Sequence, residues 1–139
     1  MGLFGKPPAP LDPDFEASLR EPTKYMRKII SKSQDIIRAN LESGEELRLI
    51  VPSDLLSSDH TFVVTTRRLL IFESPPFKGA CTKLKYVIRV TDSYHLTVDE
   101  VNRERYYIRL EGPDFTATME TSNGASASVL ASAVEAMGK

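Results

Sequence analysis

Residues 61–73 read Thr-Phe-Val-Val-Thr-Thr-Arg-Arg-Leu-Leu-Ile-Phe-Glu, and this stretch decides the fold. Two short runs rich in β-branched and aromatic residues, Thr61–Thr65 and Arg68–Glu73, flank Thr66-Arg67. Two such runs separated by two residues are typical of a tight antiparallel hairpin. Asn-Gly, a strong signal for the turn of such a hairpin, is absent. The sequence therefore predicts two antiparallel strands joined by a short turn at Thr66-Arg67.

Alternating apolar and polar residues predict further strands on both sides of this hairpin, and turn-forming residues separate them. These strands are expected at residues 46–51, 83–90, 93–98, 105–110 and 115–120. A final helix is predicted over residues 124–137, capped by Ser122 or Asn123, with Leu130, Val134 and Met137 buried. Short strands at this spacing favour a barrel or a sandwich. The predicted fold class is α+β, a seven-stranded antiparallel β-barrel or sandwich capped by a C-terminal helix.

The first 21 residues differ in composition from the rest of the chain. Four of the nine prolines lie here, at positions 7, 8, 10 and 13. Because proline lacks an N–H donor and interrupts helices, we expect residues 1–21 to form a flexible, extended tail. Leu3 and Phe4 leave open a second interpretation, a short anchor that inserts into a membrane surface or a groove on a partner.

Residues 22–42 form a separate amphipathic segment, predicted to be a helix that precedes a domain at 43–139. Its apolar residues fall within one arc, and the basic residues Lys24, Arg27, Lys28, Lys32 and Arg38 lie on the opposite arc. Two interpretations follow. Either the apolar side packs on the domain and the basic side is a solvated face, or the helix is free and meets anionic lipid or an acidic partner. The five basic residues are the candidate contacts for a partner or lipid.

The hairpin string Val64–Phe72, behind a strand that begins Gly44-Glu45-Glu46, resembles the bacterial pleckstrin-homology (PH-like) domains and, more distantly, the GRAM branch of that superfold. The resemblance covers about residues 44–137, and it implies seven antiparallel strands followed by a helix that closes one corner. In lipid-binding eukaryotic relatives, basic residues from the first strands and the loop between them face the phosphates. The loop Pro52–Asp59 departs from that pattern, because it carries Asp54 and Asp59 and no Lys or Arg. The superfold hosts lipid binding, peptide binding and oligomerisation, so the resemblance alone does not select one of them.

No pattern in the sequence indicates catalysis, so we expect no enzyme activity. His60, His95 and Cys81 are the residues that could act as bases, ligands or nucleophile, and no third group is spaced to orient a Cys81–His95 pair. No cofactor or metal is expected, because no phosphate-binding glycine loop or zinc-ligand spacing occurs. Arg105, Tyr106 and Tyr107 interleave charge and aromatic rings as single-strand binders do, but Glu104 and Glu111 flank them, and we expect no nucleic acid.

The charge and hydropathy of the chain further restrict the classes of partner that it could bind. The net charge is −1, so any preference for an anionic surface must come from a local patch. No apolar run approaches the length of about 20 residues needed to span a bilayer, and we expect a cytoplasmic protein, with contact at the inner membrane as the second possibility. The function predicted from the sequence is a binding module for protein–protein interaction or self-assembly, as a homo-oligomer. The alternative is peripheral membrane binding through the basic face of the 22–42 helix.

Overall fold

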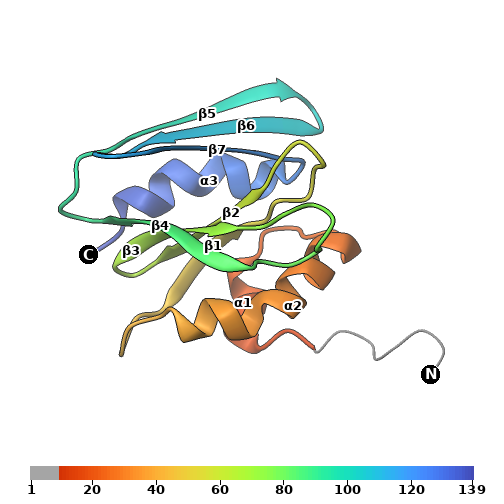
Figure 1. Cartoon of the computed structure of the whole chain (residues 1–139), viewed down its shortest axis with the longest axis horizontal. Coiled ribbons are helices and arrows are strands. Elements are labelled where there is room, and N and C mark those ends of the chain that lie inside the picture. Colours follow the sequence, from red (N-terminus) through yellow and green to blue (C-terminus); the bar gives the residue numbers. More distant parts are fainter. Residues whose placement is uncertain (1–9) are drawn as a thin grey trace.

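The computed structural model describes residues 10–139, which fold into two antiparallel sheets and three helices (Figure 1). The four-stranded sheet contains β1 (Leu47–Val51), β2 (His60–Thr65), β3 (Arg68–Glu73) and β4 (Lys83–Arg89) in chain order. The three-stranded sheet contains β5 (His95–Asn102), β6 (Arg105–Glu111) and β7 (Thr116–Thr121). The helices are α1 (Pro13–Ser18), α2 (Lys24–Ala39) and α3 (Gly124–Glu135).

The predicted class is confirmed as α+β with seven antiparallel strands and a C-terminal helix, but the strands do not close into a barrel. Each sheet keeps its own two edges, β1 and β4 in one and β5 and β7 in the other. The helix α3 lies between the two sheets (Figure 1), and its apolar residues share one core with both. A helix inserted at the open side buries the inner faces of the sheets, so the fold needs no further pairing of strands to exclude water.

The hairpin predicted over residues 61–73 is confirmed, with Phe62 opposite Ile71 and Val64 opposite Leu69. These four side chains point into the core between the sheets and are fully buried. The predicted burial of α3 is confirmed as well, since the buried residues on and just after this helix include Leu130, Val134 and Met137. The inner core therefore takes every second side chain of two continuous apolar runs, and the side chains between them are buried on the other face of the sheet.

A second core lies on the opposite face of the four-stranded sheet, beneath α1 and α2. The apolar side of α2, including Ile29, Ile30 and Ile37, packs on Ile50 and Leu70 of the sheet. Of the two interpretations of this helix, packing on the domain is therefore the one that the structure shows. The helix is shorter than predicted, since it begins at Lys24 and ends at Ala39.

The prediction of an extended segment over residues 1–21 is wrong for residues 13–18, which form α1, and residues 1–9 lie outside the described part of the chain. Pro13 takes the first helical position, where its missing N–H costs nothing. Phe15 is fully buried in the second core and Leu19 nearly so. Burial of these two side chains holds α1 against the sheet. Their burial is not evident from the local sequence.

The strand predicted over residues 93–98 is displaced toward the C-terminus. β5 begins at His95 and continues to Asn102, so Asp99 and Glu100, which lie beyond the predicted strand, belong to β5. They pair with Tyr107 and Tyr106 of β6. Cross-strand pairing therefore extends β5 in spite of the low strand propensity of acidic residues.

Candidate functional site: a groove beside the turn between β2 and β3

All five predicted contact residues on α2 are exposed, but two of them already have partners within the molecule. Arg27 forms an ion pair with Glu16, and Nη2 of Arg38 lies 3.0 Å from carboxylate oxygens of both Asp12 and Asp14. The hydrogen bond from Arg38 lowers the pKa of the Asp14 carboxyl below its ordinary value. The helix α1 and the residue before it therefore neutralise part of the predicted basic face.

The other three basic residues, Lys24, Lys28 and Lys32, are exposed and form no ion pair with any residue between 10 and 139. They recur every fourth residue, so they follow one side of the helix. The predicted five-residue face is therefore a row of three lysines.

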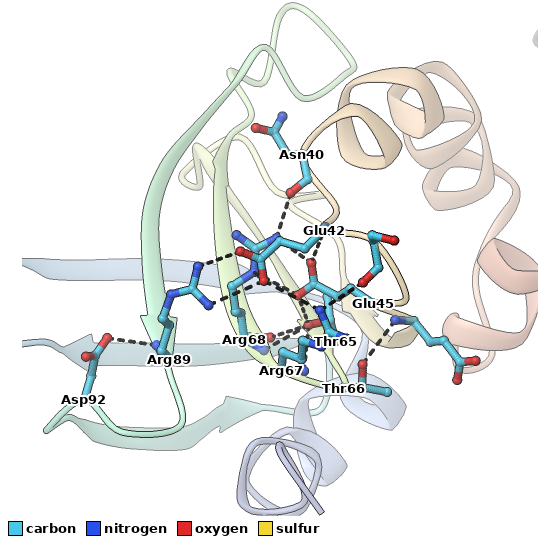
Figure 2. Close-up of polar contacts among 11 residues, drawn as sticks. Asn40, Glu42, Glu45, Thr65, Thr66, Arg67, Arg68, Arg89 and Asp92 are labelled. Atoms are coloured by element: carbon cyan, nitrogen blue, oxygen red, sulfur yellow. Dashed lines mark hydrogen bonds and ion pairs between the residues drawn. The ribbon is translucent and has the colours of Figure 1, made fainter.

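The turn between β2 and β3 is fixed by the hydroxyl group of Thr65. Its Oγ1 accepts hydrogen bonds from the backbone N–H groups of Arg67 and Arg68, at 3.1 and 2.9 Å (Figure 2). A threonine hydroxyl that bonds the following backbone replaces the missing Asn-Gly as the turn-forming element. This explains why a tight turn forms at Thr66-Arg67.

Behind this turn, Glu45 and Arg68 form a buried ion pair (Figure 2). Nε of Arg68 donates to Oε2 of Glu45 at 2.8 Å, and Nη2 of Arg68 contacts Oε1 of the same carboxylate. The side chains are 0% and 6% exposed, for Glu45 and Arg68 respectively. Nη2 also donates to the backbone carbonyl of Asn40, at 2.7 Å. The pair thus ties the end of α2 to the hairpin.

Hydrogen bonds keep the Glu45 carboxylate ionised despite its burial. Burial raises its pKa, but the hydrogen bonds from Arg68 and Thr65, with one from the backbone N–H of Glu42 at 2.8 Å, outweigh that effect and lower the pKa to about 2. The side chain of Glu42 in turn pairs with Arg89 of β4, at 2.7 Å. The cluster has no recognisable signal in the sequence, because Glu45 and Glu46 are adjacent and chemically identical and only Glu45 is buried.

A groove of about 540 Å³ opens on the other side of the same turn, between β1 and α3. We call it the basic groove. Its floor is formed mainly by apolar side chains, and its basic side chains come from three separate parts of the chain. The apolar residues are Leu49, Val129, Ala133 and Ala136, and the basic residues are Arg20, Arg48 and Lys139, with Thr65, Thr66 and Ser132 completing the lining. Among residues 10–139, no acidic side chain lines it.

The helix α3 presents an unusual surface to this groove. The residues Val129, Ser132 and Ala136 follow one side of the helix, and among residues 124–135 the only charged residue is Glu135. A surface helix of a globular protein normally carries charged side chains on the face away from its core. The outer side of α3 is therefore suited to close approach by another chain, and the sequence signal for it is the scarcity of charge in this segment.

The residues considered for catalysis are not brought together. Cys81 is buried beneath α2, where its backbone N–H donates to Oγ of Ser33 at 2.9 Å, and burial raises the pKa of its thiol. His95 is exposed on β5 of the other sheet. Among residues 10–139, no three His, Cys, Asp or Glu side chains are grouped so that they could hold a metal ion. Arg105, considered for nucleic acid, forms an ion pair with Glu120.

No protein-family model, curated protein or solved structure matches this chain. Within residues 10–139, no helix has the length and apolar character to cross a bilayer. The function proposed below therefore rests on the geometry of the groove and of the surfaces around it.

Proposed function

We propose that the chain is a non-enzymatic binding module with a PH-like fold, which acts by binding another protein or a second copy of itself. Four antiparallel strands in chain order, then three more, then a helix that packs between the sheets follow the element order of the PH superfold, and this order supports the PH-like assignment. The fold alone does not select the ligand, so the choice of a protein ligand depends on the groove.

The main support for the proposal is that the basic groove lies along the weakly charged side of α3. Apolar floors with a few charged groups at the rim are typical of surfaces that bind protein segments, since the apolar contacts provide affinity and the charges select the partner. The groove is adjacent to β1, an edge strand of its sheet whose one strand neighbour is β2. These features give another chain both side-chain contacts and a nearby sheet edge.

Site-specific photocrosslinking tests this proposal. A photoreactive residue at Ser132, in the groove, should form adducts with a protein when the full chain is expressed in its native cells. The same residue at Lys32, on the exposed side of α2, is the matched control and should give none. The partner identified at position 132 should then bind the purified chain. If position 132 gives no protein adduct, the groove does not bind protein and the proposal is wrong.

A second candidate function, peripheral membrane binding, has one specific observation in its favour. Lys24, Lys28 and Lys32 form an exposed row without ion pairs among the described residues. Basic residues near an anionic membrane contribute about 1 kcal/mol each, so three of them would support weak binding. We place this function second because Arg27 and Arg38 are already paired and the net charge of the chain is −1.

A further inference from the structure

The β5 strand carries an acidic and apolar segment that no other described part of the molecule covers. Asp99 and Glu100 are exposed, and Val101 beside them is 58% exposed. The register between β5 and β6 shifts between Glu100 and Asn102, so Val101 has no residue opposite it on β6. Bulges of this kind turn a side chain away from the sheet. We call residues 99–101 the acidic edge, because β5 is also an edge strand of its sheet.

The acidic edge and the basic groove are complementary in charge and in polarity. The groove offers Arg20, Arg48 and Lys139 among apolar side chains, and Nη2 of Arg48 lies 3.9 Å from a carboxylate oxygen of Glu46. The edge offers one exposed valine and two carboxylates that alternate between the faces of the strand, and Glu100 accepts a hydrogen bond from the Tyr106 hydroxyl at 3.4 Å. Opposite charges at the rim and apolar contact at the centre are the arrangement that favours specific association.

The two surfaces lie at opposite ends of the molecule, so they cannot meet within one copy. The groove adjoins Thr65, the last residue of β2, and Thr66, which follows it. The hairpin between β5 and β6 shares a shallow depression with residues 54–57 of the loop that precedes β2. Figure 1 shows the same separation, with that hairpin at one end and the C-terminus at the other. The six residues of β2 span about 20 Å.

We propose that the acidic edge of one copy docks in the basic groove of a second copy. This inference rests on the proposed function and names the chain itself as the partner. Contact between two different surfaces is head-to-tail, so each copy retains one free groove and one free edge. Repetition of such a contact builds a ring if the rotation closes and an open filament if it does not.

Complementary variants test the contact. The groove variant is Arg20→Glu with Arg48→Glu, and the edge variant is Asp99→Arg with Glu100→Arg. Light scattering of the purified chain at tens of micromolar should show assemblies larger than a monomer. Each variant alone should assemble at least about tenfold more weakly, because two ion pairs become repulsive. The matched control, Lys28→Glu with Lys32→Glu on α2, should assemble like the unmodified chain.

The mixture of the two variants gives the sharpest outcome. In an equimolar mixture the intact edge meets the intact groove, and the reversed edge meets the reversed groove with opposite charges. The mixture should therefore recover the assembly that each variant alone loses. Circular dichroism should show that each variant is folded. A monomeric unmodified chain would overturn the self-docking contact, as would assembly that both variants leave unchanged. If the chain is monomeric while Ser132 still crosslinks to a different protein, the inference fails and the proposed function stands.

Discussion

The pair formed by Glu45 and Arg68 is the contact on which a single substitution should act most strongly. Glu45→Gln removes the charge and leaves the Arg68 guanidinium buried without a counter-ion. Breaking a buried pair in this way costs about 3 kcal/mol or more. We therefore expect the free energy of unfolding in urea to fall by about that amount at pH 7. The exposed neighbour gives a matched control, since Glu46→Gln should change it by less than about 0.5 kcal/mol.

The stabilising effect of Glu45 should also depend on pH with a defined sign. Its pKa in the folded chain is about 2, against an ordinary value of 4.5, so folding favours the ionised form. Its contribution is therefore complete above about pH 4.5 and is lost as the pH falls toward 2. The difference in unfolding free energy between the unmodified chain and Glu45→Gln should shrink across this interval. A difference that stays constant down to pH 2.5 would contradict the low pKa.

At the scale of residues, the sequence predicts the inner core better than the polar cluster. The helical period assigns Leu130, Val134 and Met137 to one buried face, and the structure agrees. The burial of Glu45 depends on Arg68, which is 23 positions away, and on the end of α2. Local patterns carry no information on such a pairing, so the cluster could not be predicted from them.

The helix α1 has six residues, too few to be stable without tertiary contacts. Phe15 is its main anchor in the second core, and Phe15→Ala should lower the free energy of unfolding by about 3 kcal/mol. The exposed ion pair between Arg27 and Glu16 is worth less than about 1 kcal/mol, so Arg27→Gln should have a small effect. Urea denaturation of both variants measures this. Equal losses would show that ion pairs, rather than burial, hold α1 in place.

Vesicle binding through α2 would distinguish the two candidate functions. We expect negligible sedimentation of the purified chain with anionic vesicles at low salt. Of the basic residues on this helix, only Lys24, Lys28 and Lys32 have no ion pair with the part of the chain that the structure describes. The triple variant with Gln at these positions should behave identically and remain folded, since the three side chains are exposed. Strong, salt-sensitive sedimentation that the triple variant loses would promote the membrane function to first place.

Helix prediction succeeded where a long periodic pattern exists and failed where tertiary contacts decide. The 3.6-residue period in α2 is visible over its 16 residues, so the element and its buried side follow from the sequence. The prolines near α1 indicate an extended chain, and the burial of Phe15 against the sheet overrides that local preference. Contacts with another element also override local preference in β5, because pairing with β6 keeps its acidic end in the strand.

At the scale of the whole molecule, the number and order of strands were predictable but the closure of the sheets was not. A sandwich and a barrel share the same alternation along each strand, and they differ in whether the edge strands pair. The basic groove was also beyond prediction, because Arg20, Arg48 and Lys139 meet only when the N-terminal segment, β1 and the chain after α3 fold together. Its position opposite the acidic edge gives the molecule two unlike ends.

Two unlike ends on a chain of nearly balanced charge make assembly sensitive to salt. The chain has 18 basic and 19 acidic residues, so general repulsion between copies is weak and the local pairing of Arg20 and Arg48 with Asp99 and Glu100 dominates. The Debye length falls from about 10 Å at 0.1 M salt to about 3 Å at 1 M, which screens exposed ion pairs. Light scattering across this range should therefore show assemblies that become smaller as salt is added. Assemblies that grow with salt would indicate association through apolar surface alone, away from the charged rim of the groove.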